Sequence, residues 1–227
     1  MNFQKIDLGL LYKHKNFIFF FGNRNSSVEK LKIEFPSLQF SRLKQIHSDI
    51  LVDAALPSET LIEGDSHFTH QTNQALLALS ADCVPILIFD SGSKFIAAVH
   101  AGWKGVAQRL LPKTIQKLQS LGAKNKDLLI AIGPHVQFSS FNVDMDVKQK
   151  ILASLSTPEE KHFIDISKEK SKVNLAAVLE TQLEEFQLTA QYISSVDTLT
   201  NPEFHSFRRD QDQAGRQYSF VARISEA

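Results

Sequence analysis

A pair of apolar runs separated by a polar turn dominates the middle of the chain. The runs are Pro85–Phe89 and Phe95–Val99, and the turn reads Asp90-Ser-Gly-Ser-Lys94. Short apolar runs bounded by Gly, Ser and Asp are typical of buried strands, so this stretch predicts a β-hairpin. Cys83 lies just before the first run and His100 just after the second. Because these two ends of an antiparallel pair meet at one edge of the sheet, the hairpin predicts a thiol beside an imidazole.

A second histidine could join this pair. His47 lies in the alternating stretch Leu43–Val52, which predicts another strand. If that strand runs near the hairpin, two imidazoles and one thiolate come together. Such a set is typical of catalytic zinc sites, which leave the fourth position for water or substrate. The spacing is also compatible with an isolated histidine and a buried structural cysteine, both of which are common.

Several sequence blocks, taken in order, resemble the signatures of the laccase-domain family. They are Gln45-Ile-His47, Ala81-Asp-Cys-Val-Pro85, Ala98-Val-His-Ala-Gly-Trp-Lys-Gly105, Ile132-Gly-Pro134, and Phe204-His-Ser-Phe-Arg-Arg-Asp210 with Gly215-Arg-Gln217. Members are also called polyphenol oxidoreductases, purine nucleoside phosphorylases or peptidoglycan editing factors. The match extends over most of the chain after about Phe17. The resemblance implies that His47, Cys83 and His100 hold a catalytic Zn²⁺.

The resemblance also implies phosphorolysis of adenosine, inosine and methylthioadenosine, together with adenosine deamination. The His-x-Glu and Pro-Cys-x-x-Cys signature of the zinc deaminases is absent from the chain. Phosphorolysis needs a cradle for phosphate. Glycines and free amides at the start of a helix suit an anion, so Gly102, Lys104 and Gly105 are candidate phosphate-binding residues. A tight strand-to-helix junction is the alternative reading of the same turn.

Other blocks supply further candidates for substrate or phosphate binding. Arg208 and Arg209 are adjacent on a segment expected to be extended, so they should face different ways. One would point to a ligand, and the other to a carboxylate or solvent. A surface ion pair is the simpler alternative for either arginine. Asp65 resembles the family's acidic position near the site, and Gln45 belongs to the block that carries His47.

The same residues would serve other chemistries. A Cys–His pair can act as a nucleophile in a hydrolase without metal. Two histidines and a cysteine are also the ligands of blue copper, usually with a distant axial methionine. The chain offers only Met1 and Met145 and has no His-x-His pair, so copper-dependent laccase activity is disfavoured. The main alternative in the family is hydrolytic editing of a nucleotide-linked muramyl precursor.

A non-catalytic zinc protein is a further alternative. A structural zinc site normally has four protein ligands, and His135 or His205 would have to supply the fourth. His67 and His70 form a His-x-x-His pair, which we interpret as two loop histidines rather than a metal clip.

The sequence departs from the family pattern in three places. The segment from Arg24 to Lys44 is short, which leaves the substrate range open. His135-Val-Gln137 stands where relatives usually have a small residue, an apolar residue and glycine. Asp197-Thr198 stands where relatives often have Cys-Thr.

Composition narrows the class of protein. The 227 residues carry a formal net charge of zero, so nothing favours nucleic acid or an anionic membrane as a partner. A single cysteine excludes an intramolecular disulfide and fits a reducing compartment. The apolar run Phe17–Phe21 is too short for a signal core or a membrane span. We expect a cytoplasmic monomer or small homo-oligomer whose partners are a purine nucleoside and phosphate.

The periodicities predict one α+β domain over residues 1–227, with mixed β-sheets packed together and helices outside. An edge strand is expected within Met1–Lys15, and a loop from Pro57 to Gly64. The remaining strands are expected at Phe17–Phe21, Leu43–Val52, Ala75–Ser80, Pro85–Phe89, Phe95–Val99, Leu128–Ile132, Phe141–Val143, His162–Ile166, Gln191–Val196 and Gln217–Ile224. Helices are expected at Val28–Ile33, Val106–Leu121 with a break at Pro112, Asp144–Leu155 and Val173–Leu188.

Overall fold

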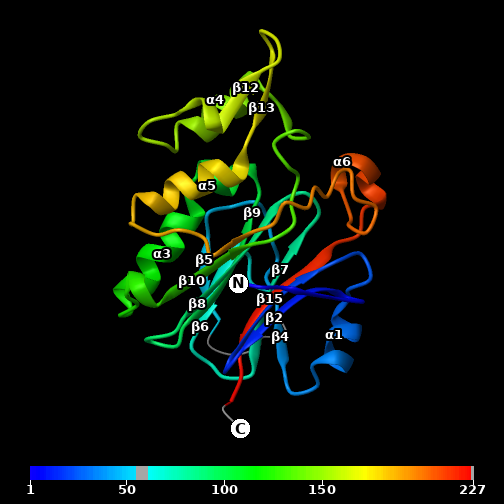
Figure 1. Ribbon diagram of the computed structural model, residues 1–227, viewed down its shortest axis with the longest axis vertical. Helices are drawn as coiled ribbons and strands as arrows, with labels where there is room; N and C mark the ends of the chain where they lie inside the picture. Colours follow the sequence, from blue (N-terminus) through cyan, green and yellow to red (C-terminus); the bar gives the residue numbers. More distant parts are fainter. Residues whose placement is uncertain (55–60, 226–227) are drawn as a thin grey trace.

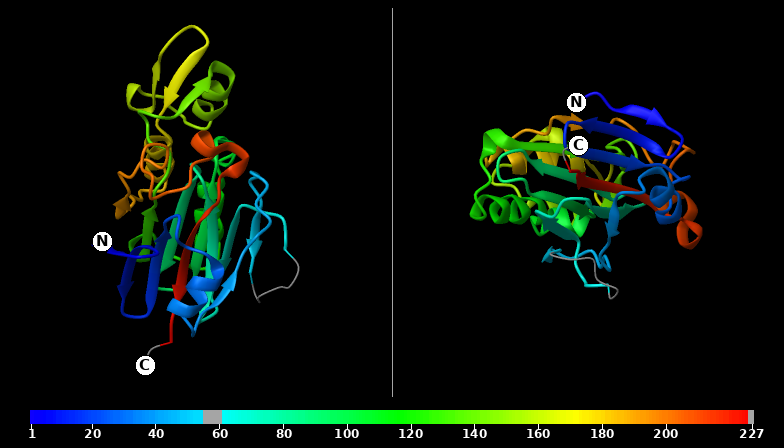
Figure 2. Two further views of the ribbon diagram at one scale, coloured as in Figure 1. Left: turned by 90° about the vertical axis from the view of Figure 1, so that its right-hand side faces the viewer. Right: turned by 90° about the horizontal axis from the view of Figure 1, so that it is seen from below.

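Two six-stranded β-sheets pack face to face in the computed structural model, which describes residues 1–54 and 61–225 (Figures 1 and 2). The first sheet has the order β1 (Gln4–Ile6), β2 (Gly9–His14), β3 (Phe17–Gly22), β15 (Gln217–Arg223), β7 (Gln74–Ser80), β4 (Gln39–Ser41). The second has the order β14 (Tyr192–Ile193), β10 (Leu128–Ile132), β8 (Val84–Asp90), β9 (Ile96–Ala101), β6 (Ser66–Thr69), β5 (Leu51–Asp53). Each sheet contains both parallel and antiparallel pairs, so the prediction of an α+β fold with mixed sheets is confirmed.

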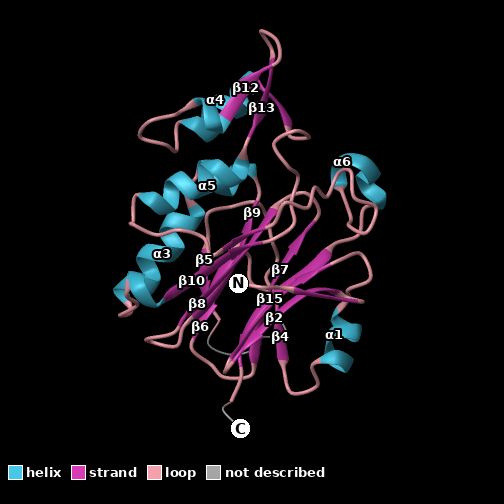
Figure 3. Cartoon of the chain, in the orientation of Figure 1, coloured by secondary structure: helices cyan, strands magenta, loops and turns pink. Residues whose placement is uncertain are grey.

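Helices lie outside the two large sheets (Figure 3). They are α1 (Val28–Glu34), α2 (Trp103–Ala107), α3 (Leu110–Ser120), α4 (Met145–Leu152), α5 (Leu175–Glu184) and α6 (Phe207–Asp210). A small third sheet, β11 (Asn142–Asp144), β13 (Lys170–Val173), β12 (Phe163–Asp165), projects with α4 at the upper end of Figure 1. No helix within residues 1–54 and 61–225 combines the length and the apolar character needed to cross a membrane.

Strand β3 is buried on both faces, which explains its continuous apolar sequence. Phe17, Phe19 and Phe21 face the core between the two sheets, and the ring of Phe17 stacks on Phe89 of β8 with 4.2 Å between centroids. Ile18 and Phe20 point the other way, into the core beneath α1. This alternation follows the two-residue period of a strand. The strand predicted from the five-residue run is therefore confirmed.

The predicted helix Val106–Leu121 is divided in two. The break falls at Gln108 and Arg109, before Pro112, and Arg109 has a left-handed φ of 61°. Pro112 lies in the first turn of α3, where its missing N–H has no intrahelical partner to lose. The restart near this proline is thus real, but it begins two residues earlier, at Leu110.

Other predicted elements are wrong or shifted. The stretch Leu43–Val52 is not a strand: residues 43–50 are irregular, and only β5 (Leu51–Asp53) forms near its end. The segment Phe204–Asp210, expected to be extended, contains the helical turn α6. Strand β14 is limited to two residues, and β13 was not predicted. Residues 57–60 of the expected loop from Pro57 to Gly64 lie outside the described residues.

Candidate metal centre

The β8–β9 hairpin brings Cys83 and His100 together, as its pattern predicts. The register pairs Pro85 with His100, so Cys83 lies at the same edge of the sheet as the end of β9. His47 reaches this edge from the irregular segment between β4 and β5. The ligand atoms of the three side chains all lie within 4.8 Å of one another, and Sγ of Cys83 is 3.7 Å from Nε2 of His47. These three residues, called the trio from here on, thus form a possible metal-binding group.

The buried carboxylate of Asp65 holds both histidines in place. It accepts hydrogen bonds from the backbone amides of Ile46, His47 and Ser48 at 3.2, 3.0 and 2.6 Å. It also accepts from the Ser48 hydroxyl at 2.7 Å and from Nδ1 of His100 at 2.8 Å. The chain therefore turns around a carboxylate, and His47 takes a left-handed φ of 58°. A regular strand cannot direct three consecutive amides at one group, which is why the strand prediction fails here.

The hydrogen bond to Asp65 also sets the tautomer of His100. A carboxylate only accepts, so Nδ1 carries the proton and Nε2 faces the other two ligands. Burial lowers the pKa of His100, but Cys83 and Asp65 outweigh it and raise the pKa to about 9. Burial raises the pKa of Cys83, whereas His100 and His47 bring it down to about 6. The thiolate that a metal requires is thus favoured before any metal binds.

The donor set fits a tightly coordinated metal ion. Gly102 leaves room for the two ligands, because a Cβ at this position would lie 2.8 Å from Cδ2 of His47 and 3.2 Å from Sγ of Cys83. Neither candidate fourth ligand, His135 or His205, belongs to the group found among the described residues. Nδ1 of His135 is 2.8 Å from the carbonyl of Gly133 in a buried position, so this ring is engaged elsewhere.

A cavity of about 370 Å³ lies beside the metal-binding group, and two of the three candidate ligands, His47 and Cys83, line it. Most of its wall is apolar or aromatic, and one arginine contributes to it. The lining consists of His47, Asp82, Cys83, Trp103, Phe141, Leu175, Phe207, Arg208 and Gln211. Predominantly apolar cavities with a few polar groups are typical of small-molecule sites.

A second buried carboxylate, Asp82, ties this cavity to the C-terminal part of the chain. Its Oδ1 accepts from the hydroxyl of Thr198 at 2.7 Å. Its Oδ2 accepts from the hydroxyl of Ser206 at 3.0 Å and from the amide of Arg208 at 2.8 Å. Because Asp82 immediately precedes Cys83, α6 is anchored directly to the turn that carries a ligand. The sequence analysis missed this residue, although it stands inside the block that contains Cys83.

The two adjacent arginines have different surroundings. Arg208 lines the cavity, its guanidinium carbon is 4.6 Å from the ring centroid of Phe141, and Nη1 donates to the carbonyl of Asn142 at 3.0 Å. Arg209 points away and donates to the carbonyls of Thr198, Leu199 and Phe204, and it pairs with Asp210. The helical turn separates the two side chains, although the extended segment assumed from the sequence is absent.

The other residues predicted to bind substrate or phosphate lie in different surroundings. The Gln45 amide exchanges two hydrogen bonds with the backbone of Leu79, at 2.7 and 2.8 Å, and so fastens its segment to β7. Lys104 is exposed on α2, with Nζ 5.8 Å from the ring centroid of Trp103. Gly102 and Gly105 are buried at the start of α2.

The His-x-x-His pair does not act as a clip. His67 is buried within strand β6, and its Nε2 lies 3.1 Å from the carbonyl of Leu77. His70 is exposed and stacks edge-on against Phe95. The two histidines therefore face different surroundings, and the interpretation of His67 as a loop residue is wrong.

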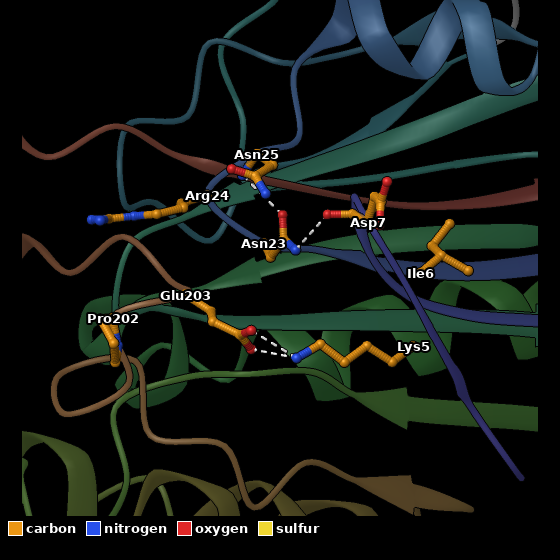
Figure 4. A pocket seen from close by; sticks show the side chains of 8 residues that line it. All are labelled: Lys5, Ile6, Asp7, Asn23, Arg24, Asn25, Pro202 and Glu203. Atoms are coloured by element: carbon orange, nitrogen blue, oxygen red, sulfur yellow. Dashed lines mark hydrogen bonds and ion pairs between the residues drawn. The ribbon is translucent and has the colours of Figure 1, made fainter.

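A larger surface cavity of about 630 Å³ shares no lining residue with the trio's cavity (Figure 4). Its side chains bind one another: Lys5 pairs with Glu203 at 2.7 Å, and Asn23 donates to the carbonyl of Asp7 at 2.9 Å. The first contact joins the hairpin of β1 and β2 to the loop before α6, and the second joins that hairpin to the segment after β3.

Comparison with known proteins relates this chain to a family. A family model described as multi-copper polyphenol oxidoreductase laccase matches residues 20–224. A purine nucleoside phosphorylase of Clostridium acetobutylicum is 31% identical over 202 residues, which cover 87% of this chain and 82% of that protein. One of Rickettsia prowazekii is 32% identical over 185 residues, covering 81% and 76%.

Solved structures share the fold. The hypothetical protein YfiH of Bacillus licheniformis matches with a TM-score of 0.88 at 22% identity, covering 98% of this chain and 99% of that one. YlmD of Geobacillus stearothermophilus matches with a TM-score of 0.88 at 20% identity and the same coverage. The extent of the family match, together with the relatives above 30% identity, shows that this chain belongs to the multi-copper polyphenol oxidoreductase laccase family.

Proposed function

We propose that this protein is a zinc-dependent purine nucleoside phosphorylase acting on adenosine, inosine and methylthioadenosine, with adenosine deamination as a second activity of the same site. The observation that carries the proposal is the His47–Cys83–His100 group, two members of which, His47 and Cys83, line a cavity with aromatic side chains and an arginine. The relatives named purine nucleoside phosphorylase support the reaction class. We also propose a cytoplasmic location, where reducing conditions would keep Cys83 a free thiol.

Zinc suits the donors better than copper. Three protein ligands with a free fourth position are typical of catalytic zinc, whereas blue copper usually adds a distant axial methionine. Neither Met1 nor Met145 is among the described residues that line the cavity. When bound, zinc would supply Lewis-acid chemistry that polarises a substrate atom or lowers the pKa of a water. His47, Cys83 and His100 would hold it.

Arg208 is the best candidate for binding phosphate. A guanidinium has five N–H donors, and among the described residues the Arg208 guanidinium donates to one protein carbonyl, from Nη1 to Asn142. The remaining donors can form paired hydrogen bonds to a phosphate, the arrangement that arginine favours. Gly102, Lys104 and Gly105, at the start of α2, would assist in binding the phosphate. We leave Gln45, Asp65 and Arg209 out of this role, because protein groups already use their polar atoms.

The test is an assay of zinc-loaded protein with inosine, with and without phosphate. Phosphate-dependent release of ribose 1-phosphate is expected, and Cys83→Ala and His100→Ala should abolish both zinc binding and turnover. His70→Ala is the matched control, since His70 is an exposed histidine outside the trio. Equal turnover by wild type and Cys83→Ala would refute the proposal.

Two further readings come from the same assay. Ammonia released from adenosine would support the deaminase activity. Release of neither product from either nucleoside would favour the editing of a nucleotide-linked muramyl precursor, the main alternative in the family. Arg208→Ala should raise the KM for phosphate, and an unchanged KM would remove Arg208 from this role.

A further inference from the structure

Phe207 is an exposed aromatic side chain that lines the cavity beside His47 and Cys83. It is 45% exposed and is the first residue of α6. Several other large apolar side chains are also exposed, but among the described residues none of them lines this cavity; they are Ile33, Ile46, Ile50, Leu61, Ile62, Leu121, Ile164 and Ile166. An apolar ring left in water at a concave site is typical of a ligand contact.

The position of Phe207 is fixed from both sides. Ser206 caps α6 by accepting from the amide of Arg209 at 3.2 Å, and its own hydroxyl donates to Asp82. On the other side, the amide of Arg208 also donates to Asp82. The backbone that carries Phe207 is therefore held against the residue next to Cys83, so the ring needs little ordering when a ligand arrives.

The rest of the apolar wall belongs to the hydrophobic core. Phe141 and Leu175 are 5% and 3% exposed and are part of the core cluster beneath the second sheet. Trp103 packs against the same cluster. A ligand that enters the cavity thus meets a fixed apolar wall, with the exposed face of Phe207 as part of the mouth. Flat aromatic ligands suit such a lining, because ring faces and edges pack well against one another.

We infer that Phe207 contacts the base of the bound nucleoside, while the adjacent Arg208 binds the anion. This inference rests on the proposed function and assigns its two substrates to two neighbouring residues. Stacking between a base and an aromatic side chain tolerates different bases, since every base presents a flat face. Phe207 would therefore recognise the purine ring in general rather than one purine in particular.

The experiment separates the two substrates. Trp103 is the only tryptophan of the chain and lines the cavity, so its fluorescence can report binding without turnover. Zinc-loaded wild type, Phe207→Ala and Phe207→Tyr are titrated with adenosine, and the KM for phosphate is measured for each. Phe207→Ala should weaken adenosine binding roughly tenfold or more and leave the KM for phosphate close to the wild-type value. Phe207→Tyr keeps the ring and should restore adenosine binding.

Ile33→Ala is the matched control, because it removes an exposed apolar side chain on α1, away from the cavity. It should change neither quantity. Unchanged adenosine binding by Phe207→Ala, or equal weakening of adenosine and phosphate, would overturn the inference, the latter by indicating that α6 itself had moved. Absence of adenosine binding by the wild type would overturn the proposed function and this inference with it.

Discussion

Replacing Asp65 by asparagine should weaken metal binding although no ligand is removed. The carboxylate accepts from three backbone amides on one segment and from Nδ1 of His100 at 2.8 Å. Asparagine keeps one carbonyl oxygen and presents an NH₂ group in place of the other. In one orientation this NH₂ meets the amides of Ile46 and Ser48, and in the other it meets His47 and His100. In each orientation the NH₂ group of asparagine faces N–H donors, so these hydrogen bonds cannot form.

Both orientations disturb a metal ligand. In the first, the turn that carries His47 loses the hydrogen bonds that shape it. In the second, Nδ1 of His100 must accept, so the proton moves to Nε2, the nitrogen that faces His47 and Cys83. Loss of such an outer partner typically lowers metal affinity about 10–100-fold. Hydrogen bonds to a charged group contribute about 1.5–3 kcal/mol each, so losing two should lower the free energy of unfolding by about 3 kcal/mol or more.

Competition with a chromogenic chelator gives the zinc affinity, and urea denaturation of the metal-free protein gives the stability. Asp82→Asn is the matched control: this carboxylate is also buried and accepts three hydrogen bonds, but none comes from a histidine. It should lose stability and keep a zinc affinity close to the wild-type value. Wild-type affinity in Asp65→Asn, or an equal loss of affinity in both variants, would refute the reasoning.

Gly102→Ala should reduce zinc affinity and leave the metal-free fold stable, because the new Cβ would lie 2.8 Å from His47 and 3.2 Å from Cys83. Gly105→Ala is the control, since its nearest neighbours would be 3.5 Å away; equal zinc affinities in the two variants would contradict this. Acid should also destabilise the protein through His67, whose burial lowers its pKa from 6.5 to about 4. This contribution is complete above pH 6.5 and is lost as the pH falls to about 4, amounting to about 3 kcal/mol. Urea titrations at several pH values should show a smaller acid loss in His67→Phe, and an unchanged acid loss would contradict this assignment.

The hairpin half of the site could be predicted because its geometry is local. The turn between β8 and β9 fixes the register, and the register places Cys83 beside His100. Alternation of apolar residues, by contrast, gave a wrong strand at 43–52. The irregular path there depends on the carboxylate of Asp65, which lies 18 residues beyond His47. A local sequence pattern does not show which distant group will accept hydrogen bonds from the backbone amides of a segment.

The arginine segment shows the same limit over a longer distance. Its helical turn depends on Asp82, which lies 126 residues before Arg208. The sequence contained both residues within recognisable blocks, but nothing in their spacing indicated that the two blocks meet. Strand β13 escaped prediction for a different reason: its sequence, Lys-Ser-Lys-Val, has little apolar character, and it is defined by pairing with β11 and β12.

Two buried aspartates therefore organise the site, each through its own set of hydrogen-bond donors. A buried carboxylate is costly unless donors surround it, so each one draws polar groups from distant parts of the chain to a fixed place. Asp65 gathers the segment of His47 against His100, whereas Asp82 gathers α6 against Cys83. Because the two carboxylates use separate donors, substitutions at them should have separable effects. Changes at Asp65 should act on the metal, and changes at Asp82 on the ligands that α6 would contact.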